Sequence, residues 1–280
     1  MMHKIELRAL QGAALLITAI TFTACTERID LELGELAEPK LVVEGWITDQ
    51  QMPHRIRLTS SRSYYENQAT PVISGAIVSI SDGEQTFPRT EEPAGSGNYL
   101  TAPDVAGTVG KLYTLNIEHD GETWLANDLM RPVPPIDSVA FEYVDQDYDD
   151  GEMPWYMVKI WTHELPGLGD HYRWKCWVNG EARSDSLKAA SFVNDQLYDG
   201  AYVQGVVVDW VRAQPGDTVR VEQHSISKDA YDIIESILLN TEWRGGIFDP
   251  PPANVPSNIS NGAYGFFGAA SVKERTAVIP

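Results

Sequence analysis

Short runs in which apolar and polar residues alternate cover most of the chain, and this period of two limits what it can fold into. In Tyr113–Ile117, for example, every second side chain is apolar, as in a strand that buries one face. Such runs are followed by three dipeptides that favour tight hairpin turns, because both turn positions take a positive φ: Asp82-Gly83, Asp120-Gly121 and Asn179-Gly180. The sequence therefore predicts a mainly β fold.

The strand-like runs fall into two groups on either side of a proline-rich joint, Arg131–Ile136. Such a joint is stiff and typical of a boundary between domains. We therefore expect one β-sandwich domain over residues 40–132 and a second β-sandwich domain over residues 136–280. The predicted strands are Leu41–Ile47, Arg55–Leu58, Ala76–Ile80, Tyr113–Ile117, Ser138–Val144, Trp155–Thr162, His171–Val178, Tyr202–Val211 and Thr218–His224.

One helix is predicted in the second domain, near residues 228–240. Ser227 is of a type that caps helices, and Asp229 in the first turn suits the helix dipole. Four apolar residues then fall on one face of the helix, which should lie across a sheet: Ala230, Ile234, Ile237 and Leu238.

The segment Phe248–Val272 contains many glycines and prolines, which prevent a helix. Its adjacent Phe266 and Phe267 are too apolar to leave in water. We expect an ordered loop in which these rings insert into the second domain or contact a partner, and we favour the core.

The start of the chain indicates where the protein is localised. An apolar run over residues 13–22 follows a basic start and ends in Thr23-Ala24-Cys25. The run is too short to cross a bilayer as a mature helix, but it suits a signal peptide. Small residues before a cysteine are typical of a lipobox, in which the chain is cut before the cysteine and the thiol receives a diacylglycerol.

We therefore predict a lipoprotein signal peptide over residues 1–24 and lipidation of Cys25, with fatty-acid chains such as palmitate as the anchor. Residues 25–39 are acidic and lead into a proline, so they are interpreted as a tether. The alternative is an ordinary secretory signal that contains a cysteine.

Cys25 and Cys176 are the only cysteines. If Cys25 is acylated, Cys176 has no partner, and the fold must be stable without a disulfide. Alternation puts Cys176 on one face with Tyr172 and Trp174, which predicts a buried and inert thiol.

The formal net charge is −19, and removal of residues 1–24 takes away Lys4, Arg8 and Glu6, a net +1, which leaves −20. This balance argues against binding of nucleic acid or anionic lipid through charge.

We find no set of residues that indicates an enzyme. The five histidines after the signal peptide lack metal-ligand spacing, and most are expected at solvent-facing positions. Ser225–Lys228 matches a Ser-x-x-Lys motif, but the companion motifs are absent, and helix capping by serine explains it.

An acidic loop is the best candidate for a metal site, and no other cofactor is expected. Asp145, Asp147 and Asp149 alternate as in a calcium loop, and carboxylates suit that ion. However, Gly151 is one place late for an EF-hand, and Tyr156 stands where the bidentate glutamate belongs. A solvated hairpin tip is the favoured alternative.

Six of the eight tryptophans lie in the second half of the chain. In Trp155–Thr162, Trp155 and Trp161 point away from the expected core side. This face is either covered by the helix or the tail, or it is a binding surface. The candidate binding residues are Trp155, Trp161 and Trp177.

Five stretches carry a resemblance to a known family: Cys25–Asp30, Leu41–Asp49, Pro71–Gly83, Pro134–Ser138 and Phe248–Val272. Together they resemble the Bacteroidota lipoproteins grouped as domain of unknown function 4249. Pro71–Gly83 is also similar to carboxypeptidase-regulatory or transthyretin-like sandwiches, so Ig-like or transthyretin-like sandwich domains are implied.

Members of this family are outer-membrane lipoproteins, commonly encoded beside TonB-dependent transporters. The resemblance therefore implies an outer-membrane, cell-surface protein that is anchored in the bilayer through Cys25. It also implies an accessory or ligand-binding role beside such a transporter. The alternative is a calcium-stabilised adhesion or structural surface protein. Neither of these two functional interpretations identifies a ligand.

Overall fold

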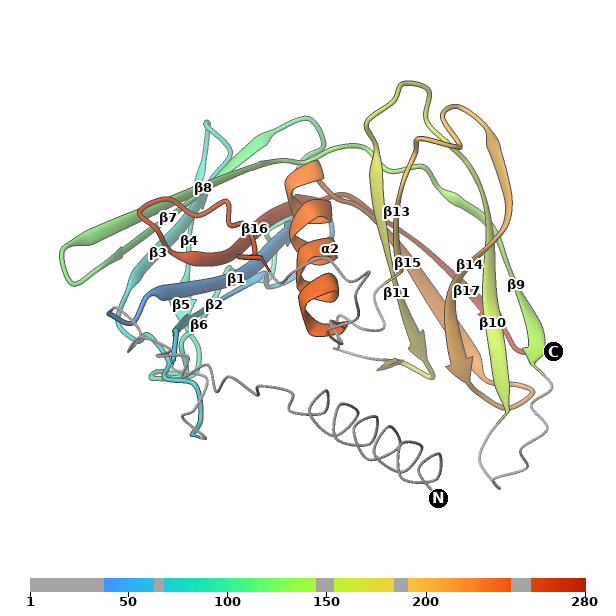
Figure 1. The fold of residues 1–280 in the computed structure, drawn as a ribbon, viewed down its shortest axis with the longest axis horizontal. Coiled ribbons are helices and arrows are strands. Elements are labelled where there is room, and N and C mark those ends of the chain that lie inside the picture. Colours follow the sequence, from blue (N-terminus) through green and yellow to red (C-terminus); the bar gives the residue numbers. More distant parts are fainter. Residues whose placement is uncertain (1–37, 63–67, 145–153, 184–190, 243–252) are drawn as a thin grey trace, which may run out of the picture. The chain divides into compact units, whose positions relative to one another are not determined.

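The computed structural model describes residues 38–62, 68–144, 154–183, 191–242 and 253–280. This part of the chain is mainly β, with several sheets in a sandwich-like arrangement and a helix, α2 (Lys228–Glu242) (Figure 1). The predicted fold class is confirmed. Residues outside the described part include Cys25 and the calcium candidates Asp145, Asp147 and Asp149.

The first pair of sheets encloses the first hydrophobic core. Val43 and Ile56 from one sheet and Ile80 and Leu115 from the other belong to this core, and none of the four has exposed surface. One sheet has the order β16 (Tyr264–Ala270), β1 (Leu41–Thr48), β2 (Arg55–Ser60), β6 (Asn98–Leu100) and β5 (Thr90–Glu91). The other has the order β4 (Thr86–Pro88), β3 (Ile77–Ser81), β7 (Leu112–His119) and β8 (Glu122–Leu129).

The second pair of sheets encloses a separate core, to which Val158 and Ile160 on one sheet and Val219 and Val221 on the other contribute. One sheet has the order β14 (Tyr202–Arg212), β10 (Trp155–His163) and β9 (Ile136–Val144). The other has the order β12 (Glu181–Ala182), β11 (His171–Val178), β15 (Thr218–Ser225) and β17 (Val272–Val278), and β13 (Ser191–Asn194) also pairs with β11.

Hairpins form at all three predicted dipeptides, but only two of these have the predicted turn. Asp82-Gly83 lies in a longer loop, residues 82–85 between β3 and β4, where Gly83 has a φ of 88° but Asp82 has no positive φ. Asp120 and Gly121, with φ values of 48° and 81°, join β7 to β8. Asn179 and Gly180, with φ values of 52° and 85°, join β11 to β12. The positive φ values explain why asparagine, aspartate and glycine stand at these positions.

The end of the chain contributes a strand to each pair of sheets, which the sequence did not predict. β16 runs parallel to β1, and β17 runs antiparallel to β15. The expectation of an ordered loop is therefore wrong for Tyr264–Ala270. The pairing of β16 with β1 also differs from the predicted domain boundaries, which placed all of residues 136–280 in one domain. The sequence pattern did not indicate strand β16, because glycines weaken a strand and the partner β1 is remote in sequence.

Both phenylalanines are buried, as expected, but neither inserts into the core of the second domain. Phe267 has no exposed surface and belongs to the first core. Phe266 points to the opposite side of β16, where its ring lies 5.2 Å from that of Trp46. The two rings therefore stabilise different parts of the molecule.

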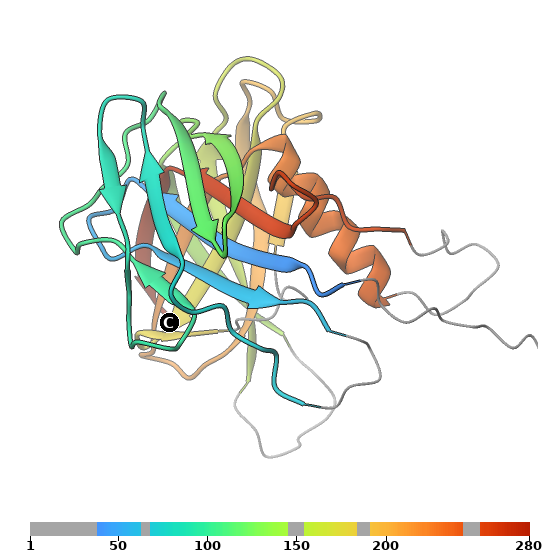
Figure 2. The same ribbon diagram turned by 90° about the vertical axis from the view of Figure 1, so that its left-hand side faces the viewer.

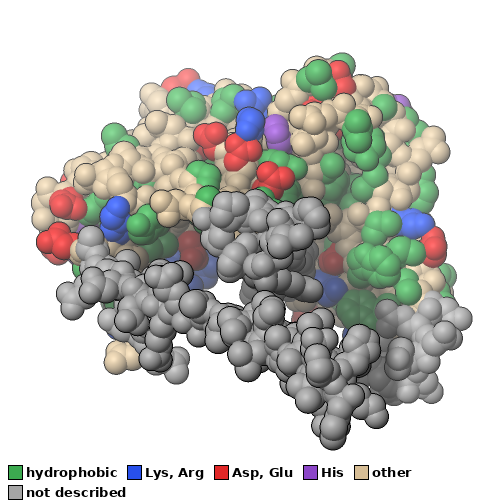
Figure 3. Space-filling model, viewed as in Figure 1, with side chains coloured by type: hydrophobic (Ala, Val, Ile, Leu, Met, Phe, Trp, Pro, Cys, Tyr) green, Lys and Arg blue, Asp and Glu red, His purple; other side chains and the backbone are tan. Residues whose placement is uncertain are grey.

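The helix begins and packs largely as the sequence predicts. The Ser227 hydroxyl accepts the backbone N–H of Ala230 at 3.2 Å, which is an N-cap. Ala230, Ile233 and Ile234 are buried and cluster with Phe266, beside β16 and β1 (Figure 2). Acidic side chains gather over α2 on the face seen in Figure 3. The helix thus buries its apolar face on the outer side of β16 and β1.

Candidate functional site

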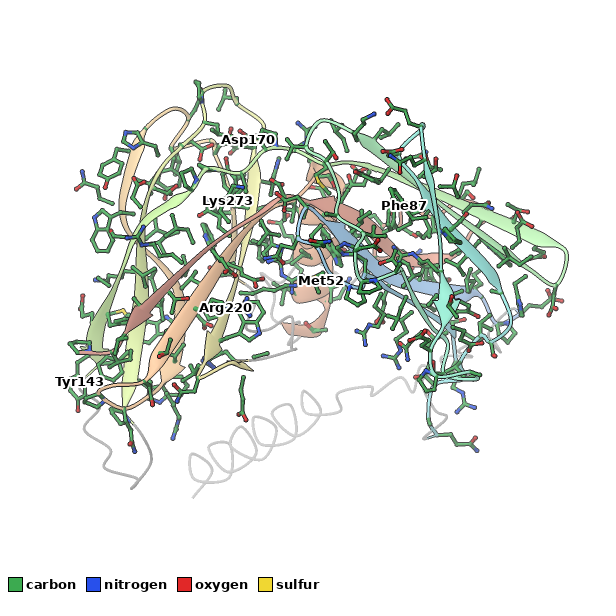
Figure 4. All side chains as sticks on the ribbon, turned by 180° about the vertical axis from the view of Figure 1, so that it is seen from behind. Met52, Phe87, Tyr143, Asp170, Arg220 and Lys273 are labelled. Carbon is green, nitrogen blue, oxygen red and sulfur yellow. The ribbon has the colours of Figure 1, made fainter. Side chains whose placement is uncertain are left out.

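A cleft of about 900 Å³ lies between the outer face of β1, the outer face of β11 and β15, and the apolar face of α2. Its first wall includes Trp46 and continues into the segment that carries Met52. Its opposite wall includes Arg220 on β15; both labelled residues can be followed in Figure 4. Ile234 of the helix and Phe266 of β16 add an apolar side.

The period of two explains the wall formed by β11 and β15. Tyr172, Trp174 and Cys176 point into the second core. The alternate residues of β11 therefore point the other way. Those residues face partners on β15 in three cross-strand pairs that all line the cleft: Arg173 with His224, Lys175 with Glu222, and Trp177 with Arg220.

Arg220 is held in place by several contacts. Its guanidinium carbon lies 4.1 Å above the centre of the Trp177 ring, a favourable cation–π arrangement. Its Nη1 also contacts Glu222 at 2.5 Å and Glu274 at 3.1 Å. These contacts fix the Trp177 ring in the cleft wall.

His224 is uncharged at neutral pH. Its pKa is lowered to about 4, because burial, with the nearby charges of Lys175 and Arg173, outweighs the raising effect of Glu222. Its Nε2 lies 3.0 Å from Glu222. Because an ionised carboxylate only accepts hydrogen bonds, Nε2 carries the proton in this pair.

Arg173 differs from Arg220, which contacts two glutamates, and from Arg55, which is exposed. Burial lowers the pKa of this guanidinium. Within the described residues it forms no salt bridge, and its buried Nε has no hydrogen-bond partner. An arginine in this state offers donors that an incoming anion can use.

A second polar site lies at the end of the second pair of sheets. Glu164, Asp170 and Asp195 place carboxylate oxygens within 4.8 Å of one another. Burial, together with the charges of Asp170 and Asp195, raises the pKa of Glu164 to about 6. Hard cations such as calcium prefer oxygen ligands of this kind.

Protein donors already bind two of these three carboxylates. The Tyr172 hydroxyl donates to Glu164 at 2.8 Å. Asp195 accepts the backbone N–H groups of Gly169 and Asp170 at 2.7 and 3.0 Å. The contacts to Asp195 fix the segment between β10 and β11, which gives the cluster a structural role independent of any metal.

The comparisons with known proteins identify the family. A family model described as a domain of unknown function, DUF4249, matches residues 26–276. The chain belongs to this family. A search among curated proteins found no match. No helix in the described part of the chain is long and apolar enough to cross a membrane.

In this DUF4249 chain, the three tryptophans predicted as binding residues do not come together. Trp155 and Trp161 lie on β10, and Trp177 lies on β11 in the facing sheet. The guanidinium carbons of Arg183 and Arg212 lie 5.1 and 4.8 Å from the Trp155 ring centre. Of the three tryptophans, only Trp177 lines the cleft.

The expectation that most histidines face solvent is wrong for three of the five. His54, His171 and His224 are buried. His54 bonds to the carbonyl of Val105 at 3.2 Å, and its pKa is lowered to about 4 by burial and by Arg89. Backbone and carboxylate partners explain why these rings tolerate burial.

The remaining candidates for chemistry have structural positions. Cys176 is buried, as predicted, and burial raises the pKa of its thiol. In the Ser-x-x-Lys motif, buried Ser225 donates its hydroxyl to the carbonyl of Arg131 at 2.7 Å, and the Lys228 ammonium pairs with Asp232 at 2.5 Å. The residue that caps the helix is Ser227.

The sequence reasoning missed Arg173, Lys175 and Arg220 as cleft residues. Alternation along His171–Val178 already places Arg173, Lys175 and Trp177 on the face opposite the core. The pattern could not show that β1 and α2 face that surface, because those contacts join segments far apart in the chain.

Proposed function

We propose that this protein is a lipid-anchored outer-membrane protein that binds a small ligand at the cell surface and assists a TonB-dependent transporter. The cleft is the observation that carries the proposal. Its volume of about 900 Å³ falls within the range of roughly 300–1,000 Å³ that is usual for small-molecule sites. Aromatic and charged side chains both line it, as such sites require.

The anchor and the transporter partner rest on the sequence. The apolar run that ends in Thr23-Ala24-Cys25 supports lipidation, and the likeness to Bacteroidota lipoproteins supports the partner. A tethered protein of this kind holds its ligand close to the transporter, which raises the local concentration of that ligand.

Lipidation is tested by the substitution Cys25→Ala. We expect the variant to accumulate as precursor or to leave the membrane fraction, because no thiol remains at position 25 to take the lipid. Metabolic labelling with a fatty-acid analogue and fractionation measure this, and Cys176→Ala is the matched control. Equal labelling of Cys25→Ala and wild type would contradict lipidation at this position.

The transporter role is tested by affinity purification of the tagged, lipidated protein from mildly solubilised outer membranes. We expect a β-barrel transporter of the TonB-dependent class to co-purify in amounts comparable to the protein itself. Recovery of the protein alone, with the barrel intact in the same extract, would contradict that part of the proposal.

The alternative function is a calcium-stabilised adhesion or structural surface protein. The cluster of Glu164, Asp170 and Asp195 is the observation that favours it. In that case millimolar calcium should raise the melting temperature relative to chelator by mass action. Asp195→Asn removes the rise if this cluster binds the ion, whereas Asp145→Asn removes it if the acidic loop does. Identical melting curves of the wild type would exclude both sites.

A further inference from the structure

We infer that the cleft selects a ligand with an anionic group and an apolar body, and that Arg173 binds the anion. The inference rests on the proposed binding function and names the ligand class. The ligand chemistry is a carboxylate, phosphate or sulfonate attached to a hydrocarbon or aromatic part.

The charge of the cleft is the first observation. The whole chain carries a formal charge of −19, yet among the described residues four cationic side chains line the cleft against two carboxylates. The cations are Arg55, Arg173, Lys175 and Arg220, and the carboxylates are Glu44 and Glu222. An acidic protein that gathers an excess of cations in one concave site creates a local field that attracts anions.

The second observation is the difference between Arg173 and Arg220. Arg220 uses its guanidinium to contact Glu222 and Glu274 and to stack on Trp177. Arg173 has no salt bridge within the described part, and its buried Nε is without a hydrogen-bond partner. A partly desolvated guanidinium that lacks a counterion is costly, and an anion in the cleft would remove that cost.

Among the described residues, the surroundings of Arg173 do not supply the missing anion. Its cross-strand neighbour His224 is uncharged at neutral pH, because burial lowers its pKa to about 4. His224 directs its Nε2 toward Glu222, 3.0 Å away. The forked guanidinium is suited to bind a carboxylate or phosphate through two parallel hydrogen bonds.

The apolar side of the cleft defines the rest of the ligand. Trp46 and Phe266 pack with their rings 5.2 Å apart beside the helix face that contains Ile234. Trp177 adds a ring on the opposite wall. Surfaces of this kind bind hydrocarbon or aromatic groups through the hydrophobic effect. A small, purely ionic ligand would leave them unused.

Two fluorescent probes with the same aromatic body separate these contributions. 8-Anilinonaphthalene-1-sulfonate carries an anionic group, and N-phenyl-1-naphthylamine is its neutral counterpart. We expect the mature wild type to bind both probes, and Trp177→Ala to weaken both. Arg173→Gln should weaken the sulfonate at least about tenfold, as loss of a charged hydrogen bond does, and should change binding of the neutral probe less than about twofold.

Arg275→Gln is the matched control, because it makes the same charge change at an exposed position of β17 that is not part of the cleft lining. Arg173→Lys keeps the charge without the fork and should give an intermediate affinity. Melting curves establish that each variant is folded, and Arg173→Lys takes the place of Arg173→Gln if that variant is not.

The outcomes distinguish this inference from the proposed function. If the sulfonate binds equally well to wild type and to both Arg173 variants while Trp177→Ala weakens it, the cleft binds ligands but the role of Arg173 is wrong. If neither probe binds to the folded wild type, or if Trp177→Ala changes neither affinity, the cleft is not the binding site and the proposed function fails as well.

Discussion

Replacing Phe267 by alanine should lower the free energy of unfolding by about 3–5 kcal/mol, the usual cost of such a change in a core. The ring has no exposed surface and belongs to the first core. It also belongs to β16, which pairs in parallel with β1. Its removal therefore creates a cavity between two sheets that the end of the chain helps to hold together.

Denaturant unfolding measures this loss, with Tyr264→Ala as the control. Tyr264 lies on the same strand but is 44 % exposed, so its substitution should cost less than about 1 kcal/mol. Phe266→Ala should cost about 3–5 kcal/mol as well, because only 8 % of Phe266 is exposed. A loss below about 1 kcal/mol for Phe267→Ala would show that the C-terminal strand does not contribute to the core as described.

Gly265→Ala should cost on the order of 4 kcal/mol, because strain of the backbone and overpacking add. Gly265 has a φ of 98°, and a Cβ there would lie 1.9 Å from the carbonyl oxygen of Val43. Val43 is the residue of β1 that pairs with Gly265 in the parallel register. A side chain at this position therefore forces β16 away from β1.

Gly83→Ala separates the two contributions. Gly83 has a φ of 88°, and a Cβ there would meet no atom within 4 Å, so only the backbone strain of about 1–3 kcal/mol remains. We expect the melting temperature of Gly265→Ala to fall well below that of Gly83→Ala. Equal melting temperatures would mean that β16 and β1 do not approach as closely as the structure indicates.

These two predictions concern the part of the fold that sequence reasoning could not reach. Local patterns predicted nine of the described strands, the hairpins at Asp120-Gly121 and Asn179-Gly180, and the helix capped by Ser227, because each depends on neighbours in the chain. They missed others, among them the long strand β8. The parallel pairing of β16 with β1 depends on residues more than two hundred positions apart. A glycine-rich strand buried on both sides has no alternating signal of its own.

The candidate site, too, could be predicted from the sequence only where it depends on local patterns. Trp177 was predicted as a binding residue, and it lines the cleft, whereas Trp155 and Trp161 do not. The sequence shows which face of β11 each side chain takes, but not what that face opposes. Arg173 becomes notable only once β1 and the helix are known to enclose it, since burial makes an arginine without a salt bridge significant.

Binding of a small ligand in the cleft is the central claim about this protein. The direct test is a crystal structure of the lipid-free mature protein in complex with the ligand, which is first identified by native mass spectrometry of protein purified from its own membranes. We predict density between β1 and the β11–β15 surface, in contact with Trp177 and Arg173. A ligand bound elsewhere, or a protein that carries no ligand while its transporter is active in the same cells, would contradict the account.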